Sequence, residues 1–141
     1  MPGQSKNFIL CVHAHQPVGN FGNVFEEAYA KCYRPFFETL EKHPRFKLVC
    51  HFSGSLLDWL EAQHPEFIQK VRRLAGGGQV EVLGGAYYEP IYNLIPKNDL
   101  AGQIDMMQRK VEVLFGCRPE GAWLTERVWD PGLVRPLERP E

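Results

Sequence analysis

The chain has 141 residues, of which 44% are hydrophobic and 23% are charged, and its formal net charge is −1. A nearly neutral chain offers no broad electrostatic attraction to nucleic acid or to an anionic membrane, and no apolar run approaches the roughly 20 residues that a membrane-spanning helix needs. The length and composition predict one globular domain with a hydrophobic core.

Strands are predicted where short apolar runs occur, at 8–12, 46–52, 79–83 and about 121–124. The first run is apolar at every position, which is typical of a strand buried on both faces. The last one leads directly to Glu126.

Helices are predicted between these runs. Helical spacing of apolar residues begins at Val24 and is interrupted by Pro35, which we expect to start a second helix. Ser55 is expected to cap the next helix. Pro65 opens another, with Phe67, Ile68, Val71 and Leu74 facing inward, which ends at the glycines 76–78. A last long helix is predicted from Asn98 or Asp99 to Gly116, with an apolar stripe formed by Leu100, Ile104, Met107, Val111 and Leu114.

The order is therefore a strand and a helix repeated about four times, which predicts an α/β fold with parallel strands and right-handed crossovers. In such folds, ligands bind at the carboxyl ends of the strands. The side chains best suited to catalysis or ligand binding all follow strands at that end, and they are His13, His15, His51, Glu89 and Glu126. This clustering predicts a functional site there.

Glu126 is flanked by Arg127 and lies between Trp123 and Trp129. Indole rings stack on sugars and cations, and a carboxylate among them is partly desolvated, which suits a nucleophile or an acid/base group. The alternative is that both tryptophans are core residues and that Glu126 and Arg127 form a surface pair.

Glu89 lies in an aromatic loop with Tyr87, Tyr88 and Tyr92. Its carboxylate could bind sugar hydroxyls, with the tyrosines as stacking platforms, or it could accept backbone hydrogen bonds within the loop. Together with Glu126 it provides the two carboxyl groups that glycoside hydrolysis needs.

His13 and His15 occupy alternate positions after the first strand, so their imidazoles point the same way and could share a metal ion, with His51 as a third ligand. The alternative is that they are buried structural imidazoles. The four cysteines, Cys11, Cys32, Cys50 and Cys117, are too scattered for a zinc motif or a disulfide framework. We expect free thiols and, with no visible signal peptide, a cytoplasmic location.

Three segments, 13–17, 84–90 and 123–129, resemble in order the first three sequence blocks of glycoside hydrolase family 57. Members of that family include α-amylases and 4-α-glucanotransferases. The resemblance implies an incomplete seven-stranded (β/α) barrel, of which residues 1–141 would be the N-terminal portion with about four βα units. It also implies retaining chemistry on α-1,4-glucans.

In this resemblance Glu126 matches the catalytic nucleophile and Trp123 an aromatic residue lining the site. His13, His15 and Glu89 match residues that position the sugar, and no metal or organic cofactor is implied. The family's general acid/base, an aspartate on a later strand, has no counterpart here, so we expect the chain alone to lack full activity.

A partial barrel leaves a sheet edge exposed, through which the chain could self-associate. Two further hypotheses stay open. The chain could be a non-catalytic glucan-binding module or one that a partner completes, or it could be a metal-dependent hydrolase built on His13, His15 and His51.

Overall fold

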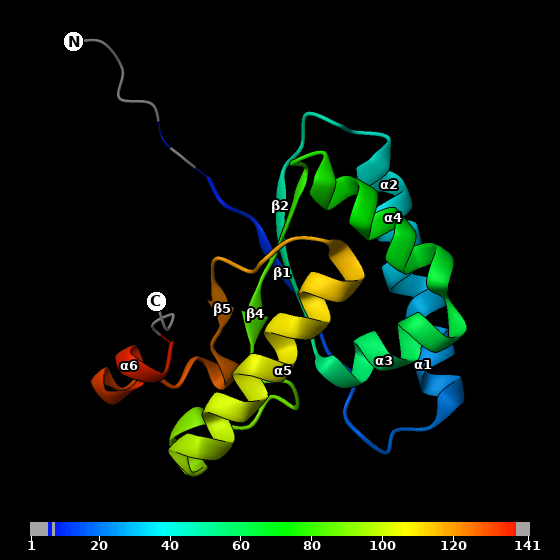
Figure 1. Cartoon of the computed structure of the whole chain (residues 1–141). Coiled ribbons are helices and arrows are strands. Elements are labelled where there is room, and N and C mark those ends of the chain that lie inside the picture. The colour runs from blue at the N-terminus through cyan, green and yellow to red at the C-terminus, as the bar shows by residue number, and fades with distance from the viewer. Residues whose placement is uncertain (1–5, 7, 138–141) are drawn as a thin grey trace, which may run out of the picture.

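The computed structural model describes residue 6 and residues 8–137. Its main sheet has three parallel strands in the order β1 (Cys11–Ala14), β2 (Leu48–Phe52) and β3 (Val80–Val82). Figure 1 shows the helices α1 to α4 gathered on one side of these strands. The α/β class with parallel strands is therefore as predicted.

The first strand differs from the prediction. It begins at Cys11 rather than Phe8, and its residues alternate between exposed and half-buried. Phe8 and Ile9 are 83% and 76% exposed. Burial on both faces was wrong because β1 is an edge strand that pairs only with β2 among the described residues, and an apolar run does not distinguish an edge position from a central one.

The strand predicted near 121–124 is present as β5 (Ala122–Trp123), and it pairs in parallel with β4 (Gly84–Gly85) in a separate two-stranded sheet. Gly85 has a φ of 149°, and a Cβ there would lie 3.1 Å from the Trp123 carbonyl oxygen. The glycine thus allows the two strands, which precede Glu89 and Glu126, to approach closely.

The first helical region runs without a break through α1 (Gly22–Ala28), a π-helical turn η1 (Tyr29–Tyr33) and α2 (Arg34–Glu41). Pro35 lies in the first turn of α2. Because proline lacks the N–H for an ordinary helical bond, the turn before it widens, and the Arg34 N–H bonds to the Tyr29 carbonyl. The predicted interruption at Pro35 is therefore a π turn.

The remaining helices are α3 (Gly54–Gln63), α4 (Pro65–Gly76), α5 (Lys97–Phe115) and the short α6 (Val134–Leu137). Single 3-10 turns form η2 (Tyr92–Leu94), η3 (Thr125–Arg127) and η4 (Pro131–Leu133). The N-cap of α3 is Ser53 rather than Ser55, whose hydroxyl instead donates to the Gln16 carbonyl oxygen. The long helix α5 ends at Gly116 with a φ of 73°, as the sequence predicted.

The core lies between the sheet and helices α2 to α5. All four apolar residues predicted to face inward from α4 are buried, and so are four of the five predicted from α5, since Ile104 is only half-buried. In the part of the chain that the structure describes, no helix combines the length and the hydropathy that crossing a membrane requires. The four cysteines are free thiols, as predicted.

Candidate active site

The carboxyl ends of β1 and β2 bring two of the predicted histidines together. His13 and His51 are direct partners in the strand register, and their Nδ1 atoms lie 3.0 Å apart. One of the two must donate a hydrogen bond to the other. His51 is fully buried, whereas His13 is partly exposed.

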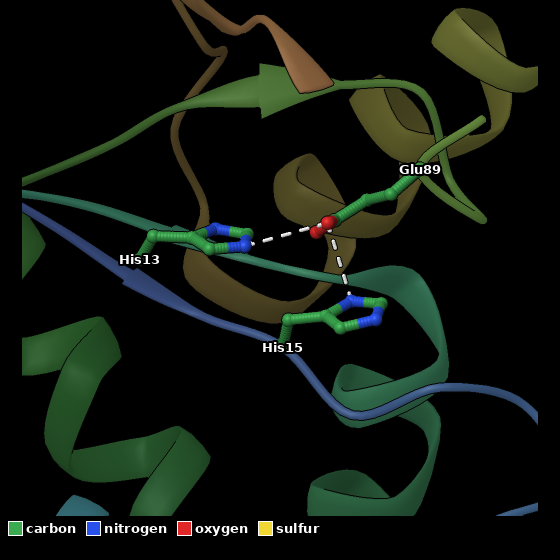
Figure 2. Close-up of side chains that lie close together, drawn as sticks. All are labelled: His13, His15 and Glu89. Atoms are coloured by element: carbon green, nitrogen blue, oxygen red, sulfur yellow. Dashed lines mark ion pairs between the residues drawn. The ribbon is translucent and has the colours of Figure 1, made fainter. Parts of the chain in front are cut away.

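Glu89 comes to the same place from the loop after β4. Its side chain is only 7% exposed, and its Oε2 atom lies 3.4 Å from His13 Nε2 and 3.2 Å from His15 Nδ1. Figure 2 shows both imidazoles turned toward this carboxylate. Its Oε1 atom lies 3.4 Å from His51 Nδ1. We call His13, His15, His51 and Glu89 the histidine–glutamate cluster.

Burial and charge act in opposite directions on this cluster. Burial tends to raise the pKa of Glu89, but a hydrogen bond from His13 and the neighbouring imidazoles outweigh it and hold the pKa below its ordinary value. Burial lowers the pKa of His51 to about 3, which Glu89 only partly opposes. The cluster therefore contains a carboxylate anion and an uncharged buried imidazole at neutral pH.

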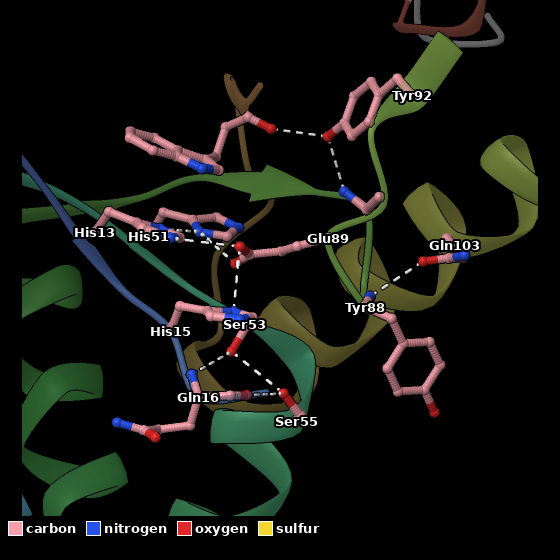
Figure 3. A network of polar contacts seen from close by, with 12 residues as sticks. His13, His15, Gln16, His51, Ser53, Ser55, Tyr88, Glu89, Tyr92 and Gln103 are labelled. Carbon is pink, nitrogen blue, oxygen red and sulfur yellow. Dashed lines mark hydrogen bonds and ion pairs between the residues drawn. The ribbon is translucent and has the colours of Figure 1, made fainter. Parts of the chain in front are cut away.

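Trp123 adjoins the cluster from β5. Its ring stacks on the His13 imidazole, with 4.3 Å between ring centroids and an interplanar angle of 6°. Its carbonyl oxygen accepts a hydrogen bond of 2.7 Å from the Tyr92 hydroxyl, which itself accepts one of 2.9 Å from the Ala86 N–H (Figure 3). Tyr92 thus ties the loop that carries Glu89 to the strand that leads to Glu126.

The interpretation of all three loop tyrosines as stacking platforms was wrong for two of them. Tyr92 is 2% exposed and Tyr87 is also buried, with its hydroxyl donating to Asp58. Only Tyr88 is half-exposed, and its backbone N–H bonds to the Gln103 side chain. The sequence alone does not show which side of this loop faces the core.

Glu126 lies in the η3 turn after β5. It has a φ of 54°, and Arg127 follows with a φ of 57°. Its side chain is exposed and makes no hydrogen bond or ion pair with the described residues, so a surface pair with Arg127 is not formed. The other part of that alternative is also wrong, because Trp129 is exposed and Trp123 is only half-buried.

One cavity collects most of the predicted site residues. It has a volume of about 420 Å³, and the residues that line it are His13, His15, Pro17, Val18, Ser55, Tyr88, Glu89, Thr125 and Glu126. A larger hollow of about 790 Å³ lies at the opposite ends of the strands and is lined mostly by apolar side chains. We assign the site to the smaller cavity because both candidate carboxylates face it.

Polar side chains to which the sequence analysis gave no role in the site lie in or next to the wall of this cavity. The Gln16 backbone N–H donates to Ser53 Oγ at 3.3 Å, and the Gln16 side chain accepts from Asn20 at 2.9 Å. Ser53 and Ser55 lie 3.3 Å apart through their hydroxyls (Figure 3). Their position just after the strand ends could have identified them, as could the place of Gln16 in the segment 13–17.

The structure also changes the predicted set of metal-ligating residues. His13, His15 and Glu89 each present one ligand atom, and these atoms all lie within 4.8 Å of one another. His51, the third ligand in the sequence hypothesis, instead turns Nδ1 to His13 and Glu89. Its Nε2 atom has no hydrogen-bond partner among the described residues.

Comparisons with known proteins agree with the resemblance. The profile of glycosyl hydrolase family 57 matches residues 9–140. An α-amylase of Pyrococcus furiosus is 49% identical over 136 residues, which are 96% of this chain and 21% of that protein. A 4-alpha-glucanotransferase of Thermococcus litoralis is 49% identical over 93% of this chain and 20% of that protein.

The crystal structure of the 4-alpha-glucanotransferase from Thermococcus litoralis superimposes with a TM-score of 0.91 at 48% identity, over 94% of this chain and 21% of that one. The chain therefore spans about a fifth of the length of the curated relatives that it matches.

Proposed function

Because the chain belongs to glycosyl hydrolase family 57, we propose that it forms the N-terminal part of the catalytic domain of a retaining α-1,4-glucan hydrolase or 4-α-glucanotransferase. The parallel βα units would be the first part of an incomplete seven-stranded (β/α) barrel. The substrate would be a glucan of the starch or glycogen type.

The observation that carries this proposal is that two carboxylates, one exposed and one buried, face one cavity. Glu126 is exposed there and makes no contact with another polar side chain among the described residues. Glu89 is buried and faced by three imidazoles. Retaining glycoside hydrolysis needs a carboxylate that is free to attack the anomeric carbon, and of these two carboxylates Glu126 is the one that is exposed and not faced by imidazoles.

In the proposed reaction, one Glu126 carboxylate oxygen bonds to the anomeric carbon while the bond from that carbon to the departing sugar oxygen breaks. Water or a sugar hydroxyl then attacks the glycosyl–enzyme ester and releases Glu126. The departing oxygen needs a proton from a general acid. We propose that this acid comes from a segment outside residues 8–137, since the family's aspartate has no counterpart among them.

The histidine–glutamate cluster would hold the sugar beside Glu126. The Glu89 anion can accept hydrogen bonds from sugar hydroxyls, and the edges of His13 and His15 that face the cavity can add further polar contacts. Trp123, which carries His13 stacked on one face of its indole, would offer its other face to a sugar ring.

The test joins this chain to the remaining C-terminal part of the Thermococcus litoralis 4-alpha-glucanotransferase and measures turnover of a maltooligosaccharide. We expect Glu126→Gln to reduce kcat by at least about 10³-fold, because a carboxamide cannot form the glycosyl ester. Glu120→Gln, which changes a carboxylate outside the cavity, is the matched control. Azide should restore turnover in Glu126→Ala by occupying the space of the lost carboxylate.

Unchanged turnover in Glu126→Gln would refute the assignment of the nucleophile. Saturable binding of the maltooligosaccharide with no cleavage by the completed wild-type protein would instead support the non-catalytic glucan-binding module.

A further inference from the structure

The two contacts of Glu89 Oε2 in the histidine–glutamate cluster are longer than charge-assisted hydrogen bonds usually are. Glu89 Oε2 lies 3.4 Å from His13 Nε2 and 3.2 Å from His15 Nδ1. Charge-assisted N–H···O bonds are usually about 2.7–2.9 Å long. In a tetrahedral zinc site with bonds of about 2.0–2.1 Å, neighbouring ligand atoms lie about 3.3–3.4 Å apart. The two distances from Glu89 Oε2 to the histidine nitrogens are therefore close to those between neighbouring ligands of one ion.

The third pair of atoms, one from each histidine, also lies close together. His13 Nε2 and His15 Nδ1 are no more than 4.8 Å apart. The His15 side chain is 36% exposed, so a small rotation can close this distance without disturbing the core. Two imidazoles and one carboxylate form a nitrogen and oxygen ligand set that zinc accepts readily.

The surroundings of the three ligand atoms are those that a metal site needs. A ligating histidine usually donates its other ring N–H to a neighbour, and His13 Nδ1 lies 3.0 Å from Nδ1 of the buried His51. The Glu89 side chain is 7% exposed, yet its Oε1 atom has no hydrogen-bond partner among the described residues. A buried anion is costly unless hydrogen bonds or a cation compensate it.

We propose that His13, His15 and Glu89 bind one divalent transition-metal ion, with zinc as the best fit, and that this ion competes with the glucan for the cluster. Three protein ligands leave the fourth position of the ion open to the cavity. The ion would occupy the lone pairs that sugar hydroxyls need, so it would act as an inhibitor. The competition between the ion and the glucan rests on the proposed function, whereas the binding of the ion does not.

A second group, formed by His64 and two carboxylates, has contacts that differ from those of the histidine–glutamate cluster. One ring nitrogen of His64 lies 3.0 Å from a Glu26 carboxylate oxygen, and the other lies 3.1 Å from a Glu66 carboxylate oxygen. These are hydrogen-bond distances, and both carboxylates are more than half exposed. One imidazole between two solvated carboxylates needs no ion, which makes His64 the natural control.

The experiment titrates zinc into the 141-residue chain at pH 7.5 in a buffer that does not chelate metals, followed by calorimetry. We expect one equivalent to bind and the affinity to fall by at least about tenfold in both His15→Ala and Glu89→Gln. His64→Ala should bind as the wild type does, because distant sites behave independently. Circular dichroism checks that each variant is folded, and the exposure of His15 makes its loss harmless to folding.

Cobalt replaces zinc in a second titration to identify the ligand atoms, because four free cysteines are also present. A spectrum without a sulfur-to-cobalt band is expected. A sulfur band, or undiminished affinity in His15→Ala, would overturn the metal site and leave the role of Glu126 untouched. Zinc that binds as expected but leaves maltooligosaccharide affinity of the completed protein unchanged would overturn the competition.

Discussion

Glu89 and Glu126 follow the two neighbouring strands β4 and β5, and both adopt the left-handed backbone conformation, with φ values of 53° and 54°. Such a conformation is uncommon outside glycine and costs about 1–3 kcal/mol. Around Glu89 the side chain is buried against three imidazoles. Around Glu126 the side chain is exposed and without polar contacts to the described residues.

The two turns therefore offset the cost of a left-handed residue in different ways. The loop of Glu89 is held through the side chain itself, with an added backbone bond of 3.2 Å from the Glu89 N–H to the Ala86 carbonyl. The turn of Glu126 is held by its neighbours, through the Arg127 N–H to the Leu124 carbonyl at 3.0 Å and the buried Thr125. The comparison indicates that Glu89 contributes to folding, whereas Glu126 contributes nothing to it.

The largest effect that separates the two carboxylates is expected from Glu89→Gly. Glycine relieves the backbone strain, but the three imidazoles lose their common partner, so the free energy of unfolding should fall by about 2–3 kcal/mol. Urea denaturation in metal-free buffer measures it. Glu89→Gln, which keeps the shape and hydrogen-bonding capacity of the side chain, should lose less. A Glu89→Gly protein as stable as the wild type would remove the distinction between the two turns.

The pH dependence of the free energy of unfolding should reflect the burial of His51 and Glu89. The pKa of His51 falls from 6.5 in the unfolded chain to about 3 in the fold, so the unfolded chain binds the proton first as the pH falls. Stability is then lost below pH 6.5, by about 2 kcal/mol at pH 5. The lowered pKa of Glu89 acts in another window, because its stabilisation is lost only as the pH falls below about 4.5.

The variant His51→Asn tests this assignment, since it keeps a donor near the Nδ1 position and cannot titrate. Denaturation of wild type and variant at pH 7, 6 and 5 should give a flatter profile for the variant. Parallel profiles would mean that the loss comes from groups other than His51.

Tyr92→Phe is expected to have a smaller effect that reaches both turns. The hydroxyl joins the Ala86 N–H to the Trp123 carbonyl, and its loss removes this partner from a buried donor and a half-buried acceptor, at a cost of about 1.5 kcal/mol. Amide exchange in the loop of Glu89 and in the turn of Glu126 should become faster together. Tyr88→Phe, at the half-exposed neighbour, is the matched control, and an equal effect there would argue against the bridge.

The parts of the fold that were predicted correctly depend on local sequence. Helix α4 places Phe67, Val71 and Leu74 inward because their spacing follows the helical repeat whatever lies opposite. Helix α5 ends at Gly116 because a left-handed residue is needed there. The errors concern what lies opposite, as with the exposed strand β1 and the buried Tyr92, for which sequence gives no signal.

The site was predicted for a topological reason, since parallel strands end at one edge and bring His13, Glu89 and Glu126 to one cavity. The role of His51 was not predicted, because it depends on the strand register that pairs His51 with His13. Sequence reasoning placed His51 among metal ligands, and only the observed register turns it toward His13 and Glu89 as their buried support. The left-handed backbone of both carboxylates had no sequence signal either.

The smallest expected effect on stability belongs to Glu126→Gly. Removing the side chain relieves about 1–2 kcal/mol of left-handed strain, and glycine returns about 0.5–1 kcal/mol of that through its extra freedom in the unfolded chain. The free energy of unfolding should therefore rise by about 0.5 kcal/mol, while Glu126→Gln, which keeps the strain, should leave it unchanged. A loss of more than about 1 kcal/mol in either variant would reveal a stabilising contact of the side chain and would weaken its assignment as a free nucleophile. A gain would mean that glutamate is held at this position at a cost to folding, for which a role at the cavity is the physical explanation.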